Sequence, residues 1–136
     1  MGEFKHKIRV SWFETDAAGV VHFSNYYKFF ERAEMEFWRS LEIDYKKIMK
    51  EYNIWLPRVE ASCKFISPCY FDDELEIRLT IGGLARKSIR YNFQVWNLST
   101  AKLAAEGHMT VVSVSKDTNR SVAIPSGIAD SLKDFI

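Results

Sequence analysis

Apolar and polar residues alternate with two different periods along this chain, and the change of period separates its predicted elements. Residues 4–12 alternate at every second position, as expected of a strand with one buried face. Residues 26–41 carry apolar side chains every three or four positions, which predicts a helix of about four turns. A shorter stretch with the same helical spacing covers residues 45–52.

The period of two returns at residue 54 and continues almost to the C-terminus. It predicts strands near residues 59–65, 75–81, 89–95 and 102–114. Gly82-Gly83 is expected to end the second of these strands, and Pro125 to start a short terminal helix. Short turns between consecutive strands favour an antiparallel sheet, on which the long helix has to bury its apolar stripe. We therefore expect one α+β domain spanning residues 1–136.

Bulk properties exclude several classes of function. A net charge of +1 and a pI of about 7.8 give no basic groove for nucleic acid and no polybasic face for a membrane surface. Cys63 and Cys69 are too few for a disulfide framework or a metal site, so we expect a cytoplasmic protein without a bound metal. The sequence shows neither the apolar segment of a signal peptide nor an apolar run of the ~18 residues that span a membrane.

Candidate chemistry is concentrated between the first strand and the long helix. Asp16, Gly19 and His22 precede the helix closely, and Ser24 or Asn25 has the side chain of a helix N-cap. A carboxylate beside the free N–H groups of a helix N-terminus is suited to acyl transfer. For a thioester this minimal set is sufficient, because a thiol with a pKa near ~8.5 leaves with little proton assistance.

The same region resembles a known family. The residues that carry the likeness are Arg9-Val10, Glu14–Val21, Asn25-Tyr26 and Phe29–Ala33, with weaker likeness at Tyr70–Ile77 and Arg86–Ser88. Together they resemble the 4-hydroxybenzoyl-CoA thioesterase-like family, which includes the Tol-Pal-associated branch, over nearly the whole chain. The resemblance implies the hotdog fold, in which an antiparallel sheet wraps around one long central helix. It also implies hydrolysis of acyl-CoA at sites formed at a dimer interface, with no cofactor apart from the CoA of the substrate.

The resemblance assigns roles residue by residue. It makes Asp16 the catalytic carboxylate, acting as base or nucleophile, and it places the backbone N–H of Phe23 on the thioester oxygen. It places Arg86 and Lys87, followed by Ser88, near the phosphates of CoA. In a purely structural reading, Arg86 and Lys87 are simply a solvated loop. An acyl carrier protein is a further partner that this chemistry admits.

The chain departs from the family pattern at three positions. Trp12 stands where the Tol-Pal-associated branch has Tyr, and Phe23 where that branch has His. The histidine of this chain is His22, one position earlier, so no side-chain role carries over to it directly. Glu14 replaces the usual first Asp of the motif, a change that we expect to matter less.

Each candidate near the helix also has a structural reading. An Asp such as Asp16 is common in turns, where it bonds nearby N–H groups, and Gly19 is then an ordinary loop glycine. In the functional reading, Gly19 lets the acyl group approach the backbone. His22 is more often a packing residue than a catalyst. Asn25 is expected to cap the helix or to orient Asp16. Asn25 and Tyr26 are also candidate substrate-binding residues, with Tyr26 in the first turn lining the acyl pocket.

Three functions from different classes follow. The first is an acyl-CoA thioesterase, the second a hotdog hydratase that pairs Asp16 with His22, and the third a non-catalytic binder of acyl thioesters. The open edges of a small sheet predict a homodimer, with a homotetramer as the alternative. The sequence leaves open whether the acyl group is aromatic, short or medium in length, and whether CoA or a carrier protein bears it. It also leaves open whether Asp16 is a nucleophile or a general base.

Overall fold

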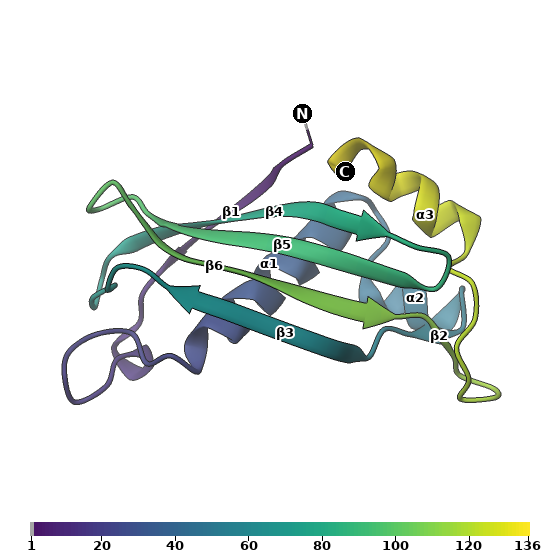
Figure 1. Ribbon diagram of the computed structural model, residues 1–136, viewed down its shortest axis with the longest axis horizontal. Coiled ribbons are helices and arrows are strands. Elements are labelled where there is room, and N and C mark those ends of the chain that lie inside the picture. Colours follow the sequence, from purple (N-terminus) through teal and green to yellow (C-terminus); the bar gives the residue numbers. More distant parts are fainter. Residues whose placement is uncertain (1) are drawn as a thin grey trace.

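The computed structural model describes residues 2–136 and contains a five-stranded antiparallel sheet with the strand order β1-β4-β5-β6-β3 (Figure 1). Its strands are β1 (Phe4–Arg9), β3 (Arg58–Phe65), β4 (Glu74–Leu84), β5 (Ser88–Asn97) and β6 (Lys102–Val112). Two short strands, β2 (Ile54–Trp55) and β7 (Val114–Ser115), pair with each other outside this sheet. The edges of the main sheet are therefore β1 and β3.

Helices cover one face of the sheet. The α-helices are α1 (Asn25–Ser40), α2 (Tyr45–Lys50) and α3 (Ser126–Leu132), and the 3-10 turns are η1 (Trp12–Glu14) and η2 (Lys133–Phe135). In Figure 1, α1 crosses behind the strands, while α3 lies beside one end of the sheet. The α+β class predicted from the sequence is thus confirmed, and α1 ends within one residue of its predicted end.

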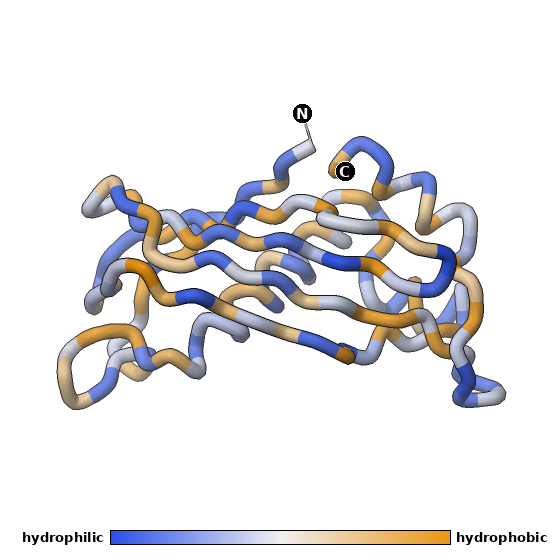
Figure 2. Tube along the Cα trace, viewed as in Figure 1, coloured by the Kyte–Doolittle hydropathy of each residue, from blue (hydrophilic) through white to orange (hydrophobic). Residues whose placement is uncertain are grey.

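The core lies between α1 and the sheet. The apolar stripe of α1 is buried without solvent exposure at Phe29, Phe30, Ala33, Phe37 and Trp38. Phe30 stacks on Phe93 of β5, with the ring centroids 4.4 Å apart. Apolar and polar residues alternate along the strands in Figure 2, which places one apolar row of each strand toward α1. Each large side chain buried in this way contributes about 1.5–3 kcal/mol to stability.

The cover that α1 provides is uneven, because most side chains of the edge strand β3 are exposed. Ala61 and Phe65 lie on the helix side of β3, since Phe65 contacts Tyr26 of α1, and yet both are exposed. The strand is also irregular near Val59, where its register with β6 shifts and the side chain is 60% exposed. The wrapping of the sheet around one long central helix therefore stays a prediction, and β3 is an open edge.

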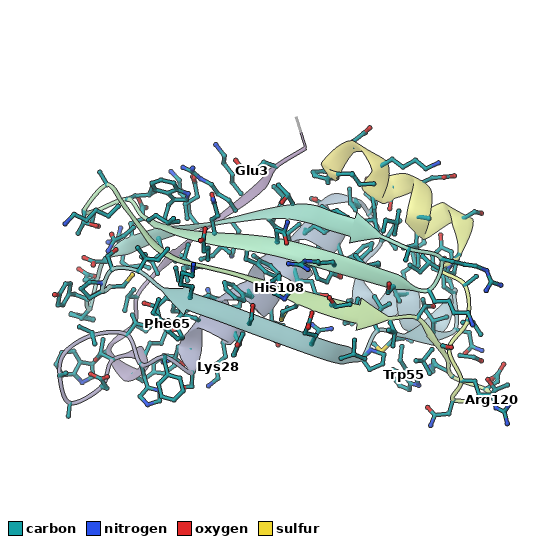
Figure 3. All side chains as sticks on the ribbon, viewed as in Figure 1. Glu3, Lys28, Trp55, Phe65, His108 and Arg120 are labelled. Carbon is teal, nitrogen blue, oxygen red and sulfur yellow. The ribbon has the colours of Figure 1, made fainter. Side chains whose placement is uncertain are left out.

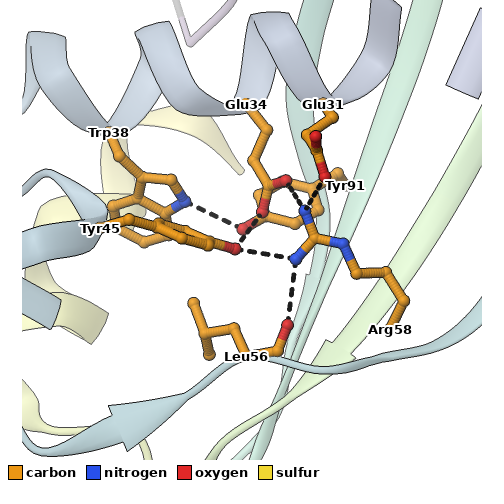
Figure 4. Close-up of polar contacts among 7 residues, drawn as sticks. All are labelled: Glu31, Glu34, Trp38, Tyr45, Leu56, Arg58 and Tyr91. Carbon is orange, nitrogen blue, oxygen red and sulfur yellow. Dashed lines mark hydrogen bonds and ion pairs between the residues drawn. The ribbon is translucent and has the colours of Figure 1, made fainter. Parts of the chain in front are cut away.

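A buried polar network attaches the start of β3 to α1 and α2 (Figure 4). The Glu34 side chain is fully buried, forms an ion pair with Arg58 and accepts a hydrogen bond from the Tyr45 hydroxyl at 2.9 Å. Arg58 also donates to the Tyr45 hydroxyl at 2.8 Å and to the Leu56 carbonyl at 3.0 Å. Burial raises the pKa of the Glu34 carboxyl, and the charge of Arg58 opposes this shift. The Glu34 carboxylate therefore has Arg58 as its counter-ion in a position that solvent does not reach.

Three predicted strand boundaries are wrong. The first strand ends at Arg9 rather than at residue 12, because the chain turns into η1. Gly82-Gly83 does not end β4, which continues to Leu84 across a register shift after Ile81. Glycine within a strand often marks such a bulge, and a Cβ on Gly82 would clash with the Asn92 amide. The last predicted strand ends at Val112 and gives way to β7.

The network in Figure 4 predicts a large loss of stability when Arg58 alone is removed. Arg58→Leu would leave the Glu34 carboxylate buried without its cation, and we expect a loss of about 3–5 kcal/mol. Adding Glu34→Leu to that variant should recover most of the loss, because no buried charge remains. Urea unfolding of both variants at one protein concentration measures this. An Arg58→Leu protein as stable as the wild type would contradict it.

Candidate active site

The segment before α1 forms a small hairpin around Asp16 and Gly19. Thr15 and Val21 pair as an antiparallel bridge, and the Asp16 N–H donates to the Val20 carbonyl at 2.9 Å. The Gly19 N–H donates to the Asp16 carbonyl at 2.9 Å and closes the turn. Gly19 has a φ of +83°, a conformation that glycine adopts without strain. A Cβ at Gly19 would meet no atom within 4 Å, so the turn accounts for this glycine.

One carboxylate oxygen of Asp16 accepts a hydrogen bond within this turn, and the other accepts none from residues 2–136. Its Oδ1 accepts a hydrogen bond from the Ala18 N–H at 2.9 Å, as turn aspartates commonly do. Within residues 2–136 no group donates to its Oδ2, and the side chain is partly exposed. The structural and the functional readings of Asp16 are therefore compatible in one geometry.

A free backbone donor precedes α1. The Asn25 N–H donates to the His22 carbonyl at 2.9 Å and the Tyr26 N–H to the Phe23 carbonyl at 3.3 Å. Ser24 is the N-cap residue, but its side chain makes no capping bond. In the part of the chain that the structure describes, the N–H of Phe23 donates to no protein acceptor. The partial positive charge of a helix N-terminus favours developing negative charge here.

Asp16 and Phe23 line the same pocket, which has a volume of about 360 Å³. Its wall consists of Asp16, Val20, Val21, Phe23, Tyr26 and the segment Phe65–Pro68. The ring of Phe65 contacts those of Tyr26 and Phe23, with centroid distances of 5.2 and 6.4 Å. Burial raises the pKa of the Tyr26 hydroxyl far above its ordinary value, so that group stays protonated. The pocket therefore combines an apolar wall with one carboxylate.

The segment Phe65–Pro68 is a part of this pocket that sequence reasoning missed. It follows the end of β3, and Figure 3 shows Phe65 at the end of the sheet that faces the Asp16 hairpin. The residue that follows this segment is joined to the hairpin, because the Val21 N–H donates to the Cys69 carbonyl at 2.8 Å. The available signal was the apolar pair Phe65-Ile66 just before Ser67-Pro68, where a solvated turn would be polar.

Two further candidates, His22 and Asn25, are not part of the pocket wall. His22 Nδ1 lies 2.8 Å from the Ser24 hydroxyl, and the imidazole stacks on Phe23 with the centroids 4.5 Å apart. Asn25 is buried, and its Nδ2 donates to the Glu14 carbonyl at 2.8 Å rather than to Asp16. Glu14 is itself buried, and its carboxylate accepts the Ser11 N–H at 2.7 Å.

Arg86, Lys87 and Ser88 lie at the other end of the sheet, in and after the turn between β4 and β5 (Figure 1). The carbonyls of Arg86 and Lys87 accept hydrogen bonds from Ile124 and Ser113, both at 2.8 Å. The intervening strand β4 is 11 residues long, and at about 3.3 Å per residue it separates the two ends by roughly 33 Å. One chain therefore does not bring these residues to Asp16.

Residues 2–136 show neither a metal site nor a membrane-spanning helix. No group of three His, Cys, Asp or Glu side chains in this range could hold a metal ion. None of the helices described is both long and apolar enough to cross a membrane.

Comparison with known proteins assigns the chain to a family. An Aquifex aeolicus protein is 33% identical over 131 residues, which are 96% of this chain and 98% of that protein. The acyl-CoA thioester hydrolase YbgC of Escherichia coli is 28% identical over 130 residues, or 96% of both chains. The structure of BH1999, a gentisyl-coenzyme A thioesterase, has a TM-score of 0.83 at 30% identity and covers 94% of this chain and 98% of its own. Residues 10–132 match the thioesterase-like superfamily, and the chain belongs to that superfamily.

Proposed function

We propose that the protein is an acyl-CoA thioesterase, which hydrolyses an acyl-CoA to the free acid and CoA. The observation that carries the proposal is the shared pocket. Asp16 and Phe23 line one cavity of about 360 Å³, and within residues 2–136 the Asp16 Oδ2 accepts no hydrogen bond and the Phe23 N–H donates none. Membership of the thioesterase-like superfamily supports the same chemistry.

The chemistry needs few groups. Asp16 either removes a proton from water as the water attacks the thioester carbon, or attacks that carbon itself and forms an anhydride that water then cleaves. In both routes the C–S bond breaks, the electron pair leaves on sulfur, and one water is consumed. The Phe23 N–H donates to the carbonyl oxygen as negative charge grows on it, an interaction typically worth about 10²–10³-fold in rate.

The size and aromatic wall of the pocket favour an acyl group that is flat or short. Its wall presents the rings of Phe23, Tyr26 and Phe65, and its volume is about 360 Å³. One relative acts on gentisyl-CoA, which carries an aromatic acyl group. A screen of thiol release over aromatic and C2–C16 acyl-CoAs, with the same acyl groups on an acyl carrier protein, identifies the preferred substrate.

We also propose that two copies complete each site. The free edge of β3 and the exposed side chains of Ala61 and Phe65 offer a surface on which a second β3 can pair. Antiparallel pairing of two β3 edges would set the Asp16 end of one sheet beside the Arg86 end of the other. Arg86 and Lys87 of the second copy would then serve the CoA phosphates. A tetramer of such dimers is the alternative assembly.

The competing functions have less support. A hydratase of the kind considered above pairs an acid with a histidine, but the His22 ring is bound to Ser24 and stacked on Phe23. A non-catalytic binder would bind acyl-CoA without turnover, which the thiol-release screen detects directly. Loss of the enoyl absorbance of crotonyl-CoA without thiol release would favour the hydratase.

Asp16→Asn is expected to lower kcat by about 10²–10⁴-fold, because the amide cannot act as base or nucleophile. The fold should survive, since the asparagine oxygen can still accept the Ala18 N–H. Thiol release measures turnover, and thermal unfolding measures stability. Asp130→Asn, an exposed change on α3, is the matched control and should retain full activity. An Asp16→Asn enzyme within threefold of the wild type would refute the assignment.

Replacing the Phe23 amide by an ester tests the oxyanion donor. Incorporation of the α-hydroxy analogue of phenylalanine at this position removes the N–H, which donates to no protein acceptor within residues 2–136. It also makes the His22 carbonyl an ester carbonyl, which accepts the Asn25 N–H more weakly. We therefore expect a loss of stability of at most about 1 kcal/mol and a kcat lower by about 10²–10³-fold. Protein prepared in the same way with phenylalanine itself at position 23 is the control. Equal turnover by the Phe23 ester and the wild type would exclude the donor role.

Mixing two inactive variants tests the shared site. Asp16→Asn subunits and Arg86→Ala/Lys87→Ala subunits are expected to regain about a quarter of wild-type kcat/KM when combined after mild dissociation. Half of the dimers are then mixed, and each mixed dimer holds one intact site of two. A mixture no more active than the mean of its parents would show that each chain acts alone, as would a stable monomer in sedimentation at micromolar concentration.

A further inference from the structure

The base of the Asp16 hairpin and the start of α1 share one acceptor, the backbone carbonyl of Glu14. This oxygen accepts the His22 N–H at 2.9 Å and the Asn25 Nδ2 at 2.8 Å. Asp16 lies two residues after Glu14, and the free N–H of Phe23 belongs to the residue after His22. The Asp16 carboxylate and the Phe23 N–H, which the proposed reaction uses, are therefore both close in sequence to residues that the Glu14 carbonyl joins.

Glu14 is itself held in place from the strand side. Its N–H donates to the Ser11 carbonyl at 3.0 Å, and its carboxylate accepts the Ser11 N–H at 2.7 Å. The side chain is only 6% exposed, so this arrangement is protected from water. The bonds within η1 thus orient the Glu14 carbonyl toward its two donors, the His22 N–H and the Asn25 side chain. A buried polar contact of this kind is costly to leave unpaired.

Asn25 supplies the only side chain in this arrangement that reaches from α1 to the hairpin base within the described residues. It is 7% exposed, and its side-chain amide donates to Glu14 rather than to the pocket. It is the first residue of α1, while Ser24 holds the N-cap position, so a capping role does not explain its side chain. A substrate contact does not explain it either, because Asn25 is absent from the wall of the pocket that Asp16 and Phe23 line.

We infer that Asn25 is a positioning residue, which holds the Asp16 carboxylate and the Phe23 N–H in a fixed mutual geometry through the Glu14 carbonyl. The inference rests on the proposed thioesterase function for its effect on rate. Its structural half, the fixing of the hairpin to α1, stands apart from that function. Misplacement of reacting groups by about 1 Å typically costs about 10²-fold in rate, so one hydrogen bond outside the pocket can govern turnover.

Asn25→Asp tests this assignment with little change of shape. The variant keeps the size of the side chain and suits the first turn of a helix, but it places an acceptor opposite the Glu14 carbonyl. We expect kcat to fall by about 10–100-fold. The KM and the dissociation constant of a thioether analogue of the substrate, which lacks the thioester carbonyl, should change by less than about threefold, because binding contacts remain. Asn25→Ala removes the donor without adding charge and should give the same split.

Hydrogen exchange of backbone amides gives a readout that does not depend on activity. In both Asn25 variants, protection of the His22 and Ala18 amides should fall, because the hairpin opens more often. Asn53→Asp is the matched control: it removes a side-chain donor to Asp117 near β7, and it should leave kcat and both amides unchanged.

The outcomes separate the two claims. Wild-type protein that releases no thiol across the whole acyl panel would refute the proposed function, while the exchange data would still decide whether Asn25 fixes the hairpin. Active wild type with an unchanged kcat or unchanged amide protection in folded Asn25→Asp would overturn the inference. A loss of analogue affinity as large as the loss of kcat would also overturn it, because Asn25 would then be a substrate contact.

Discussion

Burial of the α1 aromatic stripe against the sheet is the contact on which the rest of the structure depends. Phe30 stacks face to face on Phe93, and Phe29 and Phe37 flank it without solvent exposure. Close packing fixes the rotation and the axial position of the helix, since a shift would open cavities in the core. The first turn of α1 is fixed with it, and so are Tyr26 and the free N–H of Phe23. The position of the candidate site is therefore a consequence of core packing.

The same helix leaves β3 to be held by other means. At the start of the strand, Arg58 forms an ion pair with Glu34. At its end, the ring of Phe65 packs against that of Tyr26. Between these two points Ala61 remains exposed. A buried ion pair contributes little net stability compared with apolar packing, but it tolerates few alternative arrangements. The network thus ties the start of β3 to α1 and α2.

Most of the fold follows from periodicity, and its failures have local causes. The helical spacing located α1 and also places Glu34 on the buried side, because that residue lies four positions after Phe30. The strand end predicted at Gly82 is wrong, because a glycine that ends a strand and one that forms a bulge look alike in sequence. In the site, the motif around Asp16 identified two residues, Asp16 and Phe23, that line one pocket. Phe65 was missed because its contribution depends on how a distant strand ends, and no local pattern could show that Arg86 lies at the opposite end of the sheet.

The one-sided tether of Asp16 makes its two carboxylate oxygens inequivalent. The bond from the Ala18 N–H to Oδ1 restricts rotation of the carboxylate plane, so Oδ2 faces away from the turn with a settled direction. This bond limits the rotamers open to the side chain before any substrate is present. A turn motif common on protein surfaces thus gives the two oxygens of one acid different surroundings.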